Sequence, residues 1–277
     1  MHKIVWIRRL ALVIATISGI SAAHADLIFS TQPRGSFEKY GVPFEQVAAY
    51  LSKAIGVKVV YQHPRDWISY GQDLRQDKFD IVFDEAHFVA WRMANKKHVL
   101  VAAAVPEASE RHTVIVRAHN NDVQHIGQLA GRTVCGMSPP NFATLALLNQ
   151  FSNPLRIPLI ISVDSYDAAY RGVVDGKCAA AVLSDVALER LNKGRAMKSI
   201  FTGERLMPGD AFTVGPRVSD EVRGKILEAL LSADASTSMK TFIERYAFGK
   251  LLNLPVEEDY KGLETLLKAD YGFSRQK

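Results

Sequence analysis

The chain has 277 residues, of which 48% are hydrophobic and 23% are charged, so it can build a packed globular core and is not an intrinsically disordered chain. Its formal net charge of +5 includes Lys3, Arg8 and Arg9 near the N-terminus, and the remaining sequence is almost balanced in charge. That balance excludes the strong basic excess of nucleic-acid-binding and membrane-surface proteins, and the length allows one large domain or two small ones.

The first 25 residues have the three parts of a secretory signal peptide. Positive residues come first, a mostly apolar run from Leu10 to Ile20 follows, and Ala23 and Ala25 supply small residues at the −3 and −1 positions. The apolar run is shorter than the roughly 20 residues that a membrane span requires, which disfavours an uncleaved anchor. We therefore predict cleavage after Ala25 and an exported, periplasmic chain that begins at Asp26.

Strands and helices alternate through the next part of the chain. The sequence predicts strands at 27–30, 57–61 and 79–83, and helices at 43–55, 66–76 and 85–95. The clearest helix is 43–55, where apolar residues recur at the helical period and Gly56 follows in the position of a helix cap. This alternation predicts a largely parallel sheet covered by helices.

A second series of predicted strands and helices begins near residue 113. Strands are expected at 113–117, 133–136, 157–163, 178–183 and 212–214, and helices at 126–129, 141–151, 165–175, 184–192, 219–232 and 236–246. Because no low-complexity linker separates the two halves, we expect two α/β lobes joined by segments that cross between them near 105–112 and 207–215. The first lobe is expected to comprise residues 26–109 and 216–277, and the second lobe residues 110–215.

The two cysteines, Cys135 and Cys178, both fall in strand-like runs. A disulfide persists in the oxidising compartment that an exported protein meets. A bridge between neighbouring strands is geometrically reasonable and would contribute about 3–4 kcal/mol by the chain-entropy argument. Two free thiols, or a thiolate site for a soft metal or arsenite, are the alternatives.

In open α/β sheets a ligand binds beyond the carboxyl ends of the strands. That rule selects the loops at 31–35, 63–67, 84–88, 136–144, 164–167 and 184–185. We expect Asp84, Glu85 and His87 to face Ser138, Asn141 and Thr144 across one cleft. The full set of candidate ligand-binding residues is Arg34, Asp84, Glu85, His87, Ser138, Asn141, Phe142, Thr144, Tyr166 and Asp185.

Other roles for these residues stay open. Asp84 and Glu85 also suit a helix start, where carboxylates complement the helix dipole, and His87 also suits a protein core. A metal site for zinc, copper or iron would need a wider set: Glu85, His87, Glu107, Glu110 and His112. No tight ligand motif accompanies that set, so we predict no metal and no cofactor. No nucleophile elbow and no phosphate-binding loop motif is present either, and we therefore do not predict an enzyme.

Four stretches resemble one protein family. They are PFEQVAAYLS at 43–52, FDIVF at 79–83 with the helix after it, QLAGRTV at 128–134, and SYDAA at 165–169 followed by VVDGK at 173–177. Their order and spacing resemble the periplasmic binding components of phosphate, phosphite and phosphonate ABC transporters. The resemblance implies a two-lobed α/β clamshell of the type II periplasmic-binding-protein class, a small oxyanion as ligand, and a membrane permease as partner.

The candidate ligand contacts depart from that family. Where the family has a Ser/Thr-rich turn that opens a helix, this chain has SPPNFAT at 138–144, and its two prolines have no N–H to donate. After the third strand the family favours a small residue, a proline and an aromatic residue. Here Asp84, Glu85 and His87 occupy that loop, Phe88 stands where a tyrosine is common, and Tyr166 replaces a common histidine. Carboxylates repel a free phosphate and suit a cationic group, a metal or a neutral ligand.

The main functional hypothesis is therefore a monomeric solute-binding protein that captures a small polar ligand, with an oxyanion favoured by the resemblance, for an ABC importer. The alternative is a sensing protein that presents arsenite, a metal or another small ligand to a membrane histidine kinase. A hydrolase on a similar scaffold has the least support. No nucleic-acid partner is expected.

Overall fold

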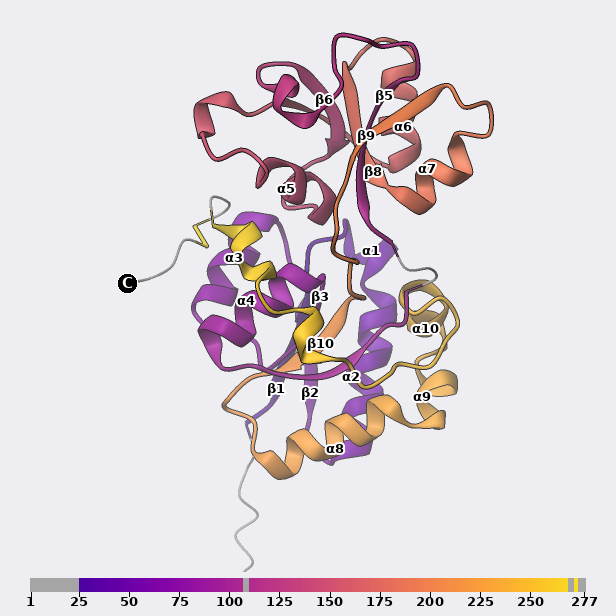
Figure 1. Ribbon diagram of the computed structural model, residues 1–277. Helices are drawn as coiled ribbons and strands as arrows, with labels where there is room; N and C mark the ends of the chain where they lie inside the picture. The colour runs from indigo at the N-terminus through magenta and orange to yellow at the C-terminus, as the bar shows by residue number, and fades with distance from the viewer. Residues whose placement is uncertain (1–24, 107–109, 269–271, 274–277) are drawn as a thin grey trace, which may run out of the picture.

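The computed structural model describes residues 25–106, 110–268 and 272–273, so the predicted signal peptide lies almost entirely outside the described residues. The chain forms two lobes, each built on a five-stranded sheet, and two segments cross between them (Figure 1). Within the described part of the chain, no helix is both long and apolar enough to cross a membrane.

The sheet of the first lobe has the strand order β2-β1-β3-β10-β4. Strand β1 is parallel to β2 and β3, whereas β10 is antiparallel to both β3 and β4. The sheet is therefore mixed, and only its first three strands fit the expected parallel arrangement. The strands are β1 (Leu27–Thr31), β2 (Val59–Tyr61), β3 (Ile81–Asp84), β4 (Val99–Ala103) and β10 (Ala211–Val214).

Helices cover both faces of this sheet. The helical elements are α1 (Phe37–Tyr40), α2 (Val42–Ile55), α3 (Trp67–Arg75), α4 (Ala86–Lys96), α8 (Asp220–Leu231), α9 (Ala233–Ser238), α10 (Lys240–Tyr246), η3 (Glu257–Asp259) and η4 (Leu263–Leu267). Helices α2, α8, α9 and α10 pack on one face, and α3, α4 and η4 pack on the other. Helix α2 ends where Gly56 adopts a left-handed conformation (φ 71°), which glycine accepts without steric cost.

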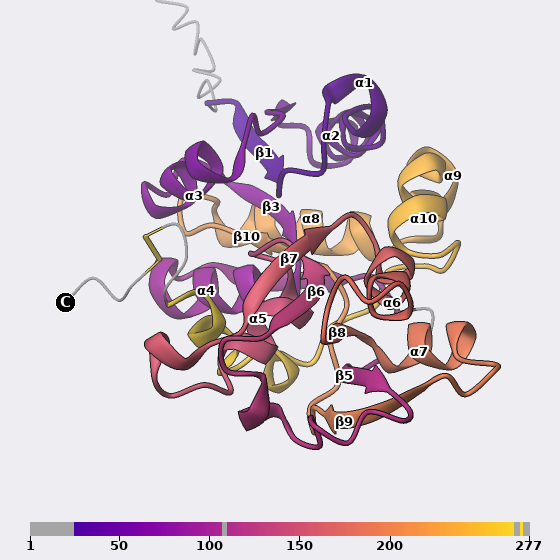
Figure 2. The same ribbon diagram turned by 90° about the horizontal axis from the view of Figure 1, so that it is seen from above.

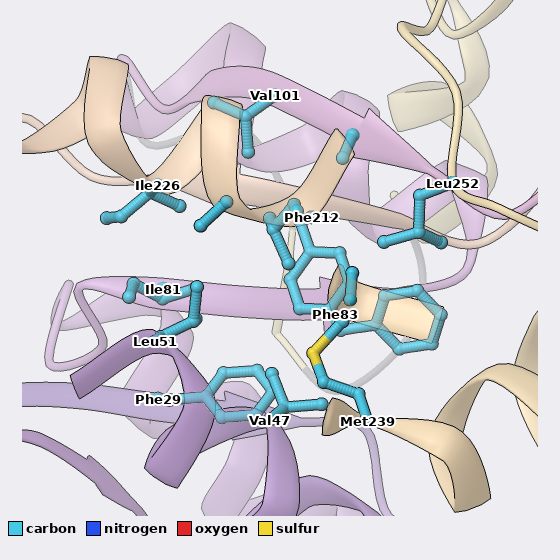
Figure 3. Packing of buried hydrophobic residues seen from close by; sticks show 14 of the residues in the cluster. Phe29, Val47, Leu51, Ile81, Phe83, Val101, Phe212, Ile226, Met239 and Leu252 are labelled. Atoms are coloured by element: carbon cyan, nitrogen blue, oxygen red, sulfur yellow. The ribbon is translucent and has the colours of Figure 1, made fainter. Parts of the chain in front are cut away.

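The largest hydrophobic cluster lies under α2, α8, α9 and α10. Phe29, Phe83 and Phe212 extend into it from three neighbouring strands, and Met239 reaches it between α9 and α10 (Figure 3). The rings of Phe83 and Phe212 have their centroids 4.7 Å apart. Complete burial of each such side chain contributes about 1.5–3 kcal/mol, so this cluster fixes the positions of the strand ends that carry the candidate site.

The second lobe repeats the plan with the strand order β7-β6-β8-β5-β9. Strand β6 is parallel to β7 and β8, whereas β5 is antiparallel to β8 and β9. Helix α5 packs on one face, and α6 and α7 pack on the other. The elements are β5 (His112–Arg117), η1 (Ile126–Leu129), β6 (Thr133–Met137), α5 (Phe142–Leu148), η2 (Pro154–Arg156), β7 (Leu159–Val163), α6 (Tyr166–Val174), β8 (Ala180–Ser184), α7 (Asp185–Leu191) and β9 (Met197–Thr202).

A disulfide joins Cys135 of β6 to Cys178, which precedes β8, with 5.7 Å between their Cα atoms. The bridge packs against Gly172 of α6, where an added Cβ would lie only 2.3 Å from the Cys135 sulfur. The predicted bridge is therefore present in the structure, and the alternatives of free thiols or a thiolate ligand site are wrong for this state of the protein.

The crossing segments run from β4 to β5 through residues 104–111 and from β9 to β10 through residues 203–210. The expected second lobe of 110–215 was therefore wrong at its end, because β10 belongs to the sheet of the first lobe. Phe212 and Val214 are fully buried there between β3 and β4. A short apolar strand suits either lobe equally well, and its pairing partners decide where it lies.

Helix α5 of the second lobe also contacts the first lobe. Its Leu145 joins a cluster with Tyr70 and Phe88, and its Phe142 joins another cluster with Val89. Both views place α5 beside α4 (Figures 1 and 2). One face of α5 therefore belongs to the second lobe's core, and another face holds the two lobes together.

Candidate functional site

A cavity of about 440 Å³ lies at the junction of the lobes. This volume is within the range of small-molecule binding sites. The first lobe, both crossing segments and the second lobe all contribute to its wall. The lining residues are Arg34, Glu85, Ala86, Ala104, Pro106, Glu110, Met137, Asn141, Phe142, Tyr166, Met207, Pro208, Gly209, Asp210, Arg245, Tyr246 and Phe248.

A second cavity, of about 680 Å³, lies against the same crossing segments. Its wall comes from residues 103–106, 205–209 and 253–261, and it includes no residue of a strand end in the second lobe. The cavity between the lobes is therefore the one that meets the strand-end rule on both sides.

Five predicted residues line the cavity between the lobes: Arg34, Glu85, Asn141, Phe142 and Tyr166. The strand-end rule placed each of them, since they follow β1, β3, β6 and β7 in the chain. The other five predicted residues do not line it, and each has a different structural role.

Arg34 follows β1, and its guanidinium lies next to two aromatic rings, 4.9 Å from the ring centre of Tyr246 and 5.9 Å from that of Phe83. One terminal nitrogen donates to the Asp210 carboxylate at 2.6 Å. Burial opposes its charge, but the carboxylates of Asp210 and Glu85 outweigh burial and raise the Arg34 pKa above its usual value. Its Nε is buried without a hydrogen-bond partner in the described structure. Arg34 is thus a fixed positive group with one donor still available.

Glu85 is held by a pair of hydrogen bonds with Gln32, a residue of the same loop as Arg34. The Gln32 amide donates to the Glu85 carboxylate at 2.8 Å, and the Glu85 backbone N–H donates to the Gln32 oxygen at 3.2 Å. Burial and the nearby negative charge of Asp210 raise the pKa of Glu85 to about 7, although Arg34 acts in the opposite direction. This carboxyl therefore exists in both protonation states near neutral pH.

The second lobe contributes neutral groups to the cavity. Asn141 caps α5, because its side-chain oxygen accepts the Thr144 backbone N–H at 3.3 Å. Tyr166 opens α6, and burial, together with the negative charges of Glu85 and Glu110, raises its pKa, so it is a neutral hydroxyl. Phe142 adds an apolar wall that is also packed at 5.7 Å against the His87 ring.

Asp84 does not reach the cavity, contrary to the expectation from sequence. Side chains alternate along a strand, so Asp84 and Glu85 point to opposite sides of the sheet. The Asp84 carboxylate is fully buried, accepts the Tyr70 hydroxyl at 2.6 Å and pairs with Arg92. Arg92 in turn donates to Thr213 at 2.8 Å. Asp84 is therefore part of a buried structural network and is not a cavity-lining residue.

His87 is also buried and does not line the cavity. Its Nε2 lies 2.9 Å from the carbonyl oxygen of Pro140, so it joins the first lobe to the second. Burial lowers its pKa to about 3, although the hydrogen bond to Pro140 acts in the opposite direction, and the ring is neutral.

Three further predicted residues lie outside the cavity lining. Thr144 is buried and donates to the Met137 carbonyl oxygen at 2.6 Å. Ser138 is exposed on the turn before α5. Asp185 accepts the backbone N–H groups of Arg111 and Val186, each at 2.9 Å, and so fixes the start of α7 beside a crossing segment.

Sequence reasoning missed the polar residues Gln32, Asp210, Arg245 and Tyr246 at the site, and also the apolar lining residues Met137, Met207 and Phe248. Gln32 lies in the selected loop 31–35 and could have been found there. Asp210 lies in a crossing segment, and Arg245 and Tyr246 lie in α10, where no strand-end rule applies.

The alternative metal site, with Glu85, His87 and His112 among its ligands, has no support in the described part of the chain. No group of three or more His, Cys, Asp and Glu side chains there is placed to hold a metal ion. His112 packs against Gly203 at the crossing segments, and Glu107 lies outside the described residues.

The fold is shared with several solved structures. XAC2383 of Xanthomonas citri, bound to ATP, aligns with a TM-score of 0.66 at 12% identity over 87% of this chain and 95% of that one. PhnD1 of Prochlorococcus marinus, in complex with methylphosphonate, aligns with a TM-score of 0.59 at 16% identity over 88% and 97%. A binding protein component of an ABC phosphonate transporter from Pseudomonas aeruginosa aligns with a TM-score of 0.58 at 16% identity over 87% and 85%.

At these identities the solved structures show the fold alone, and they confirm the predicted two-lobed clamshell. Among curated protein sequences, none matches this chain. The family model for the periplasmic substrate-binding protein of phosphonate ABC transporters matches residues 29–260, which is most of the sequence. This match confirms the resemblance that the four sequence stretches indicated, and the chain belongs to the family of periplasmic substrate-binding proteins of phosphonate ABC transporters.

Proposed function

We propose that the ligand of this chain is a small oxyanion of the phosphonate or phosphate class, bound in the cavity between the lobes and delivered to a membrane ABC permease. The observation that carries the proposal is Arg34. Its guanidinium is held at the cavity wall against two aromatic rings and by Asp210, and in the described structure it keeps a buried Nε–H without a partner. A cation fixed in this way binds an anionic oxygen without a large loss of side-chain entropy.

The rest of the cavity suits a short organic substituent on that anion. Phe142, Met207 and Phe248 supply apolar surface, and Asn141 and Tyr166 supply neutral polar groups from the second lobe. A pocket that combines apolar walls with a few placed polar groups is typical of small-molecule sites. A phosphonate with a small carbon substituent matches both parts of the wall.

The test is calorimetry with methylphosphonate on ligand-stripped protein and on Arg34→Gln. We expect the substitution to weaken binding about 10- to 100-fold, because it removes the counter-charge and leaves the Asp210 carboxylate facing the ligand. Arg190→Gln is the matched control, since Arg190 pairs with Asp167 on the exposed surface of the second lobe. Equal affinity of Arg34→Gln and wild type would reject Arg34 as the anion-binding group.

Export also belongs to the proposal, with cleavage after Ala25 and a monomeric mature chain. The disulfide supports an oxidising compartment. The intact mass of the protein released from the periplasm would identify the first residue, and a mass that includes residues before Asp26 would contradict this cleavage site.

A sensing role that depends on arsenite has no thiolate ligands in this structure, because both cysteines are in the bridge. Transport therefore remains the function that the cavity supports best.

A further inference from the structure

We propose that the cavity takes up one proton when it binds its anionic ligand, and that this proton resides on Glu85, where it donates a hydrogen bond to Nδ1 of His87. The inference rests on the proposed function, since it concerns how an anion enters that cavity. The proton comes from solvent and is returned when the ligand leaves, so no other reactant is needed.

The tautomer of His87 makes it an acceptor on the side that faces Glu85. Its Nε2 lies 2.9 Å from the Pro140 carbonyl oxygen, which can only accept, so Nε2 carries the hydrogen of the neutral ring. Nδ1 therefore has a lone pair, and it is buried without a hydrogen-bond partner. Leaving a buried polar atom of this kind unsatisfied is unfavourable, so a donor that reaches it is favoured.

Glu85 is the group that can supply the missing donor. Its Oε2 lies 3.8 Å from Nδ1 of His87, while its Oε1 accepts from Gln32. An ionised carboxylate cannot donate to Nδ1, whereas a protonated carboxyl can, after a small rotation of the side chain. The two oxygens of Glu85 thus have separate partners, and only the protonated form satisfies both.

The charges around the cavity also favour uptake of a proton. Asp210 already pairs with Arg34, so an incoming anion meets a partly neutralised cation and further carboxylates. Protonation of Glu85 removes one negative charge next to the ligand and makes Arg34 more available to it. The titratable and charged groups that interact with Glu85 are Arg34, Asp84, His87, Tyr166 and Asp210, and Glu110 lines the same cavity.

The pKa of Glu85 agrees with its role as the group that takes up the proton. Burial and Asp210 raise its pKa to about 7, so the proton is available near neutrality. His87 stays neutral because burial lowers its pKa to about 3. The resulting chain, Glu85 to His87 to the Pro140 carbonyl oxygen, joins the cavity to the contact between the lobes.

The experiment is calorimetry with methylphosphonate between pH 6 and 8.5, in buffers of different ionisation enthalpy, on wild type and Glu85→Gln. We expect wild-type affinity to fall about tenfold more per pH unit above pH 7 than that of Glu85→Gln, because only the protonated fraction binds. The titration of the ligand itself is common to both proteins and cancels in the comparison. Glu221→Gln, which changes an exposed carboxylate of α8 that pairs with Lys225, should keep the wild-type pH slope. Equal slopes for wild type and Glu85→Gln would overturn the proposal.

A ligand-free measurement separates this proposal from the identity of the ligand. In ¹⁵N-histidine NMR spectra, the Nδ1 signal of His87 should shift between pH 8.5 and 5.5 as Glu85 becomes a donor, and Glu85→Ala should abolish the shift. If methylphosphonate fails to bind but this shift is seen, the proposed ligand is wrong and the Glu85–His87 contact stands. A His87 signal that does not move with pH would reject that contact, whatever the ligand.

Discussion

The two lobes have equivalent strand orders, but they contribute different kinds of side chain to the cavity. Each has three parallel strands in an equivalent order, β2-β1-β3 and β7-β6-β8, followed by one antiparallel strand, β10 or β5, and an edge strand, β4 or β9, that pairs antiparallel with it. The charged residues in the described cavity wall come from the first lobe and the crossing segments, whereas the second lobe contributes Met137, Asn141, Phe142 and Tyr166. Charge recognition is therefore built on one lobe, and the other lobe closes over it with neutral groups.

The lobes are also stabilised by different means. The first lobe has the larger hydrophobic cluster. In the second lobe the edge strand β7 leaves Leu159 and Ile161 exposed, and the lobe carries the disulfide. The difference indicates that hydrophobic packing stabilises the first lobe, which carries charged groups of the site. In the second lobe, which carries the neutral groups, a disulfide adds to the packing.

The largest effect should come from breaking the buried charge network of the first lobe. Asp84→Ala removes the partner of Arg92, whose side chain is only 1% exposed, and leaves a buried positive charge. We expect a loss of about 3–5 kcal/mol in the free energy of unfolding, measured in urea. Asp220→Ala, which removes an exposed ion pair with Arg223, should change stability by less than about 0.5 kcal/mol. A loss below about 1 kcal/mol for Asp84→Ala would show that the network is dispensable.

The second lobe should depend comparably on its covalent link. The bridge spans 43 residues of sequence, so replacing both cysteines with alanine should cost about 3–4 kcal/mol by the chain-entropy argument. Hydrogen exchange should locate the loss in β6, α6 and β8, with the first lobe unaffected. Equal loss of protection in both lobes would mean that they unfold as one unit and would weaken the contrast between them.

Much of this architecture could be predicted from the sequence, because hydrophobic periodicity and helix caps identify individual helices and strands. Ser165 and Ser184, for example, accept backbone N–H groups at the starts of α6 and α7. Strands β4 and β9 were not predicted, and β10 was assigned to the wrong lobe. Pairing between distant strands depends on tertiary burial, which local patterns do not encode.

The site was predictable only in part for the same reason. The rule that ligands lie beyond strand ends found Arg34 and Glu85, but it could not separate Glu85 from Asp84. One residue of register decides which carboxylate reaches the cavity and which enters the core. Asp210 and Tyr246 come from a crossing segment and a C-terminal helix, so their proximity to Arg34 is a property of the assembled fold.

A smaller effect should be seen in how stability depends on pH. The first lobe contains the buried His87, whereas His119 and His125 of the second lobe are exposed. Burial lowers the pKa of His87 to about 3, so the unfolded chain binds a proton near pH 6.5 where the folded chain does not. This contribution to stability is complete above pH 6.5 and is lost as the pH falls from 6.5 towards 3. At pH 5 the loss should be about 2 kcal/mol.

His87→Gln isolates that contribution, because a glutamine amide can still donate to the Pro140 carbonyl oxygen but does not titrate. Glu85 acts in the opposite direction, since its raised pKa favours the folded state as the pH falls below about 7, so both proteins carry Glu85→Gln to remove that contribution. Urea unfolding at pH 7.5 and pH 5 should therefore show the protein that retains His87 losing about 2 kcal/mol relative to the one with His87→Gln between the two conditions. If both proteins respond equally to pH, the imidazole is protonated in the folded state. The contact between the lobes would then be a charge-assisted hydrogen bond to the Pro140 carbonyl oxygen, and the neutral acceptor that Glu85 needs would not exist.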